Sequence, residues 1–240
     1  MTGTLKRRAL LLVLLLAAAW FTVPAARSFA AGGCAPTGVP PPADAAQRKV
    51  RDLDWDGRPD TLWVGQSRDG SPSSQGHIDR VVGVTTASGD NAQVEVTSAS
   101  PIPLAALAID AQQDGQHQII VSDGRSAQLY VFADCKLQTV ADNQGAPFLF
   151  DLQNLRDHGT GVGCGDVGPS SPGRHLVGLQ ALNDGQWTVR RTEIDLNGTL
   201  ATIGPSDTVT AASAQDPAVT SAQTISCGDL TLAKDGVQQP

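Results

Sequence analysis

The 240-residue chain is acidic, with 24 Asp and Glu against 17 Lys and Arg, and only 4% of its residues are aromatic. The surplus of acids argues against nucleic-acid binding, which depends on Lys and Arg neutralising phosphates, and against adsorption to an anionic membrane surface. The length suffices for one domain with a sizeable core.

The first 30 residues have the layout of a secretory signal peptide. Three basic residues at 6–8 precede an apolar run over 9–23, and small residues at 28 and 30 suit a signal peptidase. Cleavage would leave 13 basic against 24 acidic residues, because the segment holds four basic residues and no acidic ones. We therefore expect a secreted or extracytoplasmic protein.

Two alternatives to cleavage remain open. The apolar run is long for a signal peptide, so it could stay as an N-terminal membrane anchor. Small residues at 31–33 precede Cys34, which is the arrangement of a lipoprotein, although Arg27 interrupts the apolar approach. Contact with a membrane is expected only through one of these two anchors.

The rest of the chain divides by composition. Residues 31–48 are rich in Pro and Ala and predict a linker. Residues 49–232 hold short Val, Ile, Leu and Thr runs between Gly and Pro turns, which indicates a single all-β domain. Residues 233–240 form a polar tail that we expect to be frayed.

Four cysteines remain after the leader: Cys34, Cys135, Cys164 and Cys227. An even number in an exported chain predicts two disulfides, for which three pairings exist. We favour Cys34–Cys135 and Cys164–Cys227, because each closes a long loop. Zinc is the alternative, but no two of the cysteines are close enough in sequence to form a ligand pair.

A pattern of Asp, Gly and a short apolar strand occurs three times. The leading acids are Asp52, Asp110 and Asp166, which are 58 and 56 residues apart. The strands expected after them are 61–64, 118–121 and 175–179. A period of this length is typical of propeller blades or stacked β units.

Further strands lie between these units. We expect hairpins from 81–86 and 93–97 around Gly89, and from 187–194 and 200–203 around Asn197-Gly198, a pair that tolerates the positive φ of a tight turn. A strand at 128–132 follows the turn at Asp123 and Gly124. Residues 205–221 predict a loop with a short helix.

The segment Asp52-Leu53-Asp54-Trp55-Asp56-Gly57-Arg58-Pro59-Asp60 carries the clearest chemical signal. Calcium takes six to eight oxygens, often from alternate positions of a short loop. The Asp side chains at 52, 54, 56 and 60 supply four carboxylates, and Gly57 allows a sharp turn. Four acids in nine residues repel one another without a cation. The twelfth position is Trp63 where an EF-hand has Glu, and a strand follows in place of a helix.

This D-x-D-x-D-G-x-x-D loop before a strand resembles the calcium loop of FG-GAP/VCBS repeats, as in the β-propeller of integrin α-chains. The resemblance covers about residues 50–182. It implies Ca²⁺ bound by Asp52, Asp54, Asp56 and Asp60, with Arg58 supplying its carbonyl. It also implies a small β-propeller, or a propeller-like array of three to four short antiparallel sheets; three sheets are few for a closed ring.

The resemblance weakens in the later units. The second unit keeps Asp110 and Asp114, but Gln112 and Gln118 stand where acids are expected, so at most a degraded ion site is predicted. The third unit keeps Asp166, whereas residues 169–173 replace the other acids. We expect no ion there.

No recognisable catalytic apparatus is found. The residues His77, His117, His158 and His175 are scattered, and neither H-E-x-x-H nor G-x-S-x-G occurs. Trp63 and Trp187 are expected in the core, whereas Trp55 is a candidate for surface contact. The sequence thus predicts an exported calcium-binding interaction or scaffold module whose partner is an extracytoplasmic protein or a glycan. An extracytoplasmic hydrolase or a glycan-binding protein on the same fold is the alternative.

Overall fold

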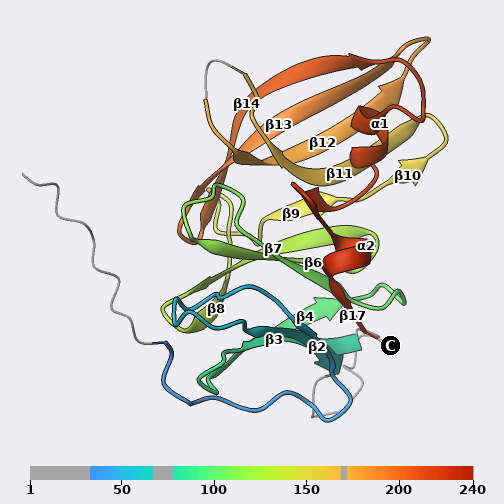
Figure 1. The fold of residues 1–240 in the computed structure, drawn as a ribbon. Coiled ribbons are helices and arrows are strands. Elements are labelled where there is room, and N and C mark those ends of the chain that lie inside the picture. The colour runs from blue at the N-terminus through green and yellow to red at the C-terminus, as the bar shows by residue number, and fades with distance from the viewer. Residues whose placement is uncertain (1–32, 67–77, 169–171, 240) are drawn as a thin grey trace, which may run out of the picture. The chain divides into compact units, whose positions relative to one another are not determined.

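The computed structural model describes residues 33–66, 78–168 and 172–239. The expected signal peptide and His77 lie outside these ranges. Within them the protein is all-β, as predicted, and is built from antiparallel sheets, none of which closes on itself. Three of the sheets follow one another along the chain (Figure 1).

The first sheet is a meander of four antiparallel strands in chain order. Its strands are β1 (Ala46–Lys49), β2 (Thr61–Gln66), β3 (Ile78–Thr85) and β4 (Asn91–Ser98). Strand β2 is apolar and buried, whereas β4 alternates between buried and exposed positions, as a strand with one covered face does. Trp63 of β2 is fully buried, as expected.

The middle sheet repeats this meander and adds two short strands from elsewhere. The meander consists of β5 (Ala105–Ile109), β6 (His117–Ser122), β7 (Ser126–Ala133) and β8 (Lys136–Thr139). Strand β9 (Leu149–Asp151) also pairs with β7, and β17 (Val237–Gln238) pairs with β5. Every residue of β6 is buried, because both faces of this sheet are covered.

The third sheet has five antiparallel strands, followed by short elements. Its strands are β10 (Asn154–Leu155), β11 (His158–Gly165), β12 (His175–Asn183), β13 (Trp187–Asn197) and β14 (Leu200–Ala211). After them come α1 (Pro217–Ser221), β15 (Ser226–Cys227), β16 (Leu230–Thr231) and α2 (Leu232–Asp235). Gly198 takes a φ of +59° in the tight turn expected between β13 and β14.

The side chains of the middle sheet alternate between two cores. One core joins Ala106, Ile119 and Tyr130 to first-sheet residues such as Leu62 and Val84. The other core joins neighbouring positions of the same strands to the third sheet, with these members among others: Leu107, Ile120, Leu129, Val162, Leu176 and Ile194. The middle sheet therefore lies between the other two (Figure 1). A third core packs α1 against the third sheet.

The two ends of the domain differ from the boundaries expected from the sequence. The expected linker, 31–48, contains β1 and the buried Cys34. The expected tail, 233–240, contains most of α2 and all of β17, and Val237 is only 4% exposed. Strand β14 also continues to Ala211, through the first part of the expected loop 205–221, which then forms α1. Pairing with β2, β5 and β13 stabilises these polar segments as strands.

The cysteines are paired as favoured, Cys34 with Cys135 and Cys164 with Cys227. The first disulfide joins the segment before β1 to the β7–β8 turn, and the second joins β11 to β15. In this pairing the Cys34 sulfur is not free to carry a lipid. Across the described ranges, no helix is long and apolar enough to cross a membrane.

Candidate metal centre

The three Asp-containing loops occupy the same place in their sheets. The acidic loop (residues 52–60) connects β1 to β2, the second loop (110–118) connects β5 to β6 and includes the start of β6, and the third loop (166–174) connects β11 to β12. Each is thus the connection between the first two long neighbouring strands of its unit. The spacing found in the sequence corresponds to a structural position.

Three carboxylates of the acidic loop converge. Oxygens of Asp52, Asp54 and Asp60 all lie within 4.8 Å of one another. Two oxygens bound to one Ca²⁺ at about 2.3–2.6 Å can be at most about 5 Å apart, so this group fits a single ion. Without a cation, each pair of charges at this separation repels by about 1–3 kcal/mol.

Asp60 is the buried member of the group, with no exposed surface. Its Oδ2 accepts the backbone N–H of Leu53 at 2.7 Å, and its Oδ1 accepts that of Ala87, in the β3–β4 turn, at 2.8 Å. Burial raises the pKa of Asp60 to about 6, the charges of Asp54 and Asp52 raise it further, and the two amide hydrogen bonds lower it. A cation at the group would relieve both the burial of the charge and the repulsion.

The other two carboxylates turn the loop. Asp52 Oδ2 accepts the N–H of Gly57 at 2.7 Å, and Gly57 has a φ of +82°. Asp54 Oδ2 accepts the N–H of Cys34 at 2.8 Å. Each carboxylate oxygen has a second lone pair, so these hydrogen bonds leave room for a bound ion.

Asp56 differs from its expected role. Its carboxylate accepts the backbone N–H of Arg58 at 2.8 Å and the Arg58 guanidinium at 2.6 and 2.9 Å. These hydrogen bonds hold the pKa of Asp56 below its usual value. Asp56 is not among the converging carboxylates, because its charge is neutralised within the loop.

The second loop has the same hydrogen-bond pattern at an offset of 58 residues. Asp110 accepts the N–H of Gly115 at 3.2 Å, as Asp52 accepts that of Gly57. Gln118 Oε1 accepts the N–H of Ala111 at 3.0 Å, as Asp60 accepts that of Leu53. Left-handed φ values recur as well, in these pairs: Trp55 and Gln113 (64° and 57°), Gly57 and Gly115 (82° and 84°). The two loops thus share one backbone conformation.

The substitutions in the second loop make it self-sufficient without a cation. The Gln118 amide accepts from Ala111 with its oxygen and donates from Nε2 to the Gln116 carbonyl at 2.9 Å. Gln112 replaces the second carboxylate with a neutral side chain. In the described residues this loop contributes to no group of three metal-ligand side chains.

Trp55 joins the first two loops. Its ring centroid lies 5.9 Å from that of His117, and a Cβ added to Gly115 would stand 2.0 Å from the Trp55 ring. Trp55 is nevertheless 47% exposed, whereas His117 is buried and its pKa is lowered by burial. The two loops therefore present one surface with an aromatic side chain between them.

The third loop is built differently. Asp166 accepts the N–H of Gly168, two residues later, at 2.7 Å. Residues 169–171 lie outside the described ranges. The remaining described part shows no counterpart of the hydrogen bond by which Asp52 closes the acidic loop.

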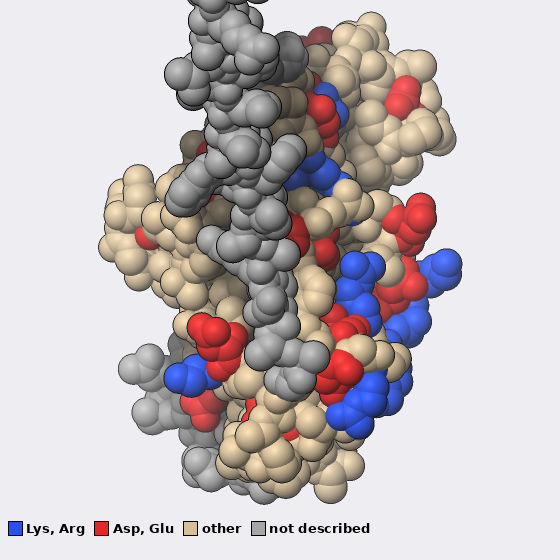
Figure 2. Space-filling model, turned by 60° about the vertical axis from the view of Figure 1, so that its left-hand side comes forward, with Lys and Arg blue, Asp and Glu red and all other residues tan. Residues whose placement is uncertain are grey.

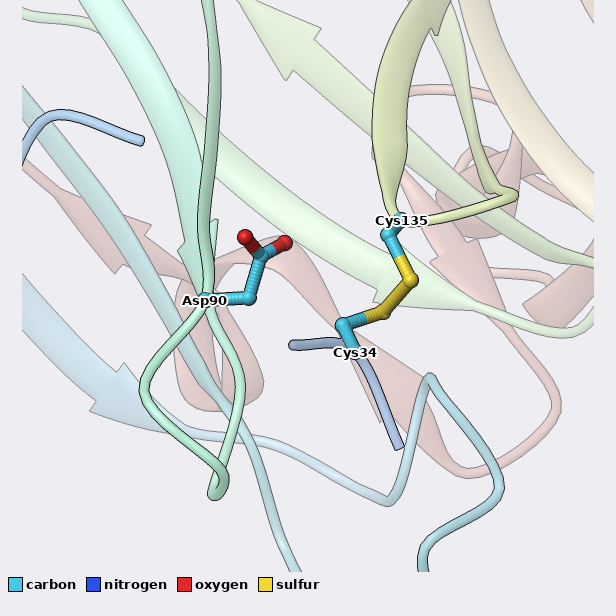
Figure 3. Close-up of side chains that lie close together, drawn as sticks. All are labelled: Cys34, Asp90 and Cys135. Carbon is cyan, nitrogen blue, oxygen red and sulfur yellow. A yellow bond between two sulfur atoms is a disulfide. The ribbon is translucent and has the colours of Figure 1, made fainter. Parts of the chain in front are cut away.

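Two further groups of metal-ligand side chains occur in the described residues. Figure 3 shows the Cys34–Cys135 disulfide beside Asp90; the disulfide excludes metal ligation there, because the thiolate is the ligand form. In the third sheet, His175 Nδ1 lies 3.1 Å from Oε1 of the fully buried Glu193, with Asp195 nearby. Val177 pairs with Glu193 across β12 and β13, at a bulge of β13.

Charge on the molecular surface is mixed. On the face seen in Figure 2, acidic and basic side chains lie close together along one side. Such interspersed charges suit a solvated surface, whereas nucleic-acid binding would need a stripe of one sign.

Sequence reasoning identified the carboxylates but missed the amides that position them. The N–H groups of Cys34 and Ala87 come from segments 20 and 27 residues from their acceptors, and backbone amides leave no mark in a sequence. No family model matches the chain, and no curated protein or solved structure is significantly similar to it.

Proposed function

We propose that this chain is an exported β-sheet interaction module whose acidic loop binds Ca²⁺. The observation that carries the proposal is the pair of loops with one backbone conformation and different charge. The second loop folds in the same way with Gln at the positions of Asp54 and Asp60. The conformation therefore does not require the converging charges of the acidic loop, and a bound cation accounts for them.

The donor set favours calcium. Carboxylate oxygens are hard ligands, and three of them within 4.8 Å of one another suit an ion with long bonds and a variable coordination number. Mg²⁺ demands a tighter octahedron with bonds of about 2.0–2.1 Å. We expect carbonyl oxygens, that of Arg58 among them, and water to supply the remaining ligands.

The arrangement of loops and sheets supports a relationship to FG-GAP/VCBS repeats. Each of the three loops connects neighbouring antiparallel strands of its unit, and the middle sheet buries both faces between its neighbours. We propose an open, propeller-like array of three such units. Only the first unit keeps the full set of acids.

The ion would act by linkage. A cation that binds only the folded loop stabilises the folded state by mass action. Because Trp55 lies in this loop and contacts the second loop, a bound ion would also fix the surface that the two loops present. We propose that this surface binds an extracytoplasmic protein or a glycan.

Calorimetric titration of residues 31–240 with CaCl₂, and separately with MgCl₂, tests the proposal. Parent protein should bind one Ca²⁺, and Asp52→Asn should abolish or strongly weaken binding. Asp110→Asn is the matched control, since Asp110 holds the equivalent position, and it should leave the affinity unchanged. Absence of Ca²⁺ binding in the parent would sink the proposal, and equal binding in Asp52→Asn would sink the site. Glycan pull-down with and without chelator then separates glycan from protein partners.

A further inference from the structure

The segment before β1, residues 33–38, lies directly against the acidic loop. The N–H of Cys34 donates to Asp54 Oδ2 at 2.8 Å, and Cys34 is only 3% exposed. A Cβ added to Gly33 would stand 2.7 Å from Asp54 Oδ2 and 2.8 Å from Asp56 Cβ. The packing is therefore too close for any side chain at position 33.

The same segment is held on its other side by the β3–β4 turn. The N–H of Asn91 donates to the Thr37 carbonyl at 2.9 Å, and the N–H of Thr37 donates to Asp90 Oδ1 at 3.2 Å. The hydroxyl of Ser88 donates to the Cys34 carbonyl. This turn also contributes the Ala87 N–H that binds Asp60. Two of the converging carboxylates thus depend on contacts made by one small assembly of segment and turn.

The Cys34–Cys135 disulfide is the covalent anchor of that assembly. It bonds the segment to the β7–β8 turn of the middle sheet, across 101 residues of sequence, with a Cα–Cα distance of 5.5 Å (Figure 3). Apart from this bond, the contacts that we describe for residues 33–38 are hydrogen bonds and packing. Breaking it would remove the tie between Cys34, whose amide holds Asp54, and the middle sheet.

We propose that the Cys34–Cys135 disulfide is a redox-sensitive latch that controls the affinity of the acidic loop for Ca²⁺. A dithiol reductant would cleave the S–S bond, supplying two electrons and two protons; two cysteine thiols form, and the reductant becomes a disulfide. The released segment no longer holds the Asp54 carboxylate, so the loop must order it when the ion binds.

The proposal rests on calcium binding by the acidic loop and adds its regulation. Coupling between two sites is reciprocal, so an ion that prefers the latched loop must also protect the disulfide from reduction. Couplings of this kind usually change affinity by about 5- to 150-fold. We expect about a tenfold loss of Ca²⁺ affinity on opening the latch, because one charge-assisted hydrogen bond and its tether are lost.

The second disulfide supplies a matched control. Ca²⁺ titrations compare the parent, the Cys34→Ser/Cys135→Ser variant and the Cys164→Ser/Cys227→Ser variant, with circular dichroism to confirm folding. We expect weaker binding in the first variant only. Equal affinity in parent and first variant would overturn the latch while leaving the proposed calcium site intact. Equal loss in both variants would assign the effect to general destabilisation and would also overturn it. No binding in the parent would instead refute the proposed function.

A second measurement uses the unaltered protein. Dithiothreitol reduces it with Ca²⁺ or with chelator, and the free thiols are alkylated and quantified by mass spectrometry over time. Ca²⁺ should slow the appearance of Cys34 and Cys135 thiols about tenfold and leave the rate for Cys164 and Cys227 nearly unchanged. Equal protection of both disulfides, or of neither, contradicts a specific latch.

Discussion

Asp60 and Gln118 stand at equivalent positions 58 residues apart, and each accepts the backbone N–H of the residue seven positions before it, at 2.7 and 3.0 Å. A carboxylate and an amide thus perform the same structural task. What distinguishes them is charge, and charge is what a cation recognises.

Asp54→Asn should separate the structural and ionic roles of the acidic loop. The amide oxygen can still accept the N–H of Cys34, so in chelator we expect the free energy of unfolding to stay within about 0.5 kcal/mol of the parent. The increase in stability with added Ca²⁺ should be lost. Urea denaturation in chelator and in millimolar Ca²⁺ measures both. Asp114→Asn, in the second loop, should keep the full response to Ca²⁺.

The pH dependence of stability without calcium should carry the signature of Asp60. Its pKa is raised from 3.8 to about 6 by folding, so the folded state favours the protonated acid. The stability from this group is therefore fully present below about pH 4 and is lost as the pH rises through about 6. The difference in unfolding free energy between parent and Asp60→Asn isolates it, because other acids titrate in both proteins. A flat difference between pH 4 and pH 7 in calcium-free buffer would contradict this assignment.

Alanine at two equivalent glycines should have different effects on stability. Gly57→Ala places a side chain at a φ of +82° with no atom within 4 Å of its Cβ, so a cost of about 1 kcal/mol is expected. Gly115→Ala meets the same backbone strain and also displaces the Trp55 ring, so its cost should exceed that of Gly57→Ala by about 1 kcal/mol or more. Urea denaturation in chelator, followed by circular dichroism, measures both. Equal costs would mean that Trp55 does not rest on the second loop.

The last strand should contribute to global stability. Val237→Ala removes two buried methyl groups from β17 and should cost about 2 kcal/mol. Gln238→Ala, at the neighbouring exposed position, should change stability by less than about 0.5 kcal/mol. Guanidinium denaturation of both variants provides the comparison. A harmless Val237→Ala would support the frayed tail expected from the sequence.

The sequence predicts those features that local chemistry determines. Asn197 and Gly198 specify a turn by their own conformational preferences, and the buried strand around Trp63 is specified by its apolar run. The acidic loop is visible for the same reason: its carboxylates are adjacent in sequence.

Features that depend on a distant partner could not be predicted. Strand β1 reads Ala-Gln-Arg-Lys, which has no apolar pattern, and it is a strand because β2 offers a hydrogen-bonding edge. Strand β17 is only two residues long and depends on β5 in the same way. The pairing of Asp56 with Arg58 was equally hidden, because the sequence does not show which oxygen a guanidinium will take.

The pairing of β17 with β5 also sets the order in which the protein can fold. Val237 lies opposite Ala106, and the N–H of Gln239 donates to the Leu104 carbonyl at 2.8 Å. A ribosome releases the N-terminal part of a chain first, so the edge of β5 waits without its partner until the final residues emerge. The centre of the protein is completed last, and a nascent or prematurely terminated chain presents an open sheet edge to proteases and to other unfolded chains.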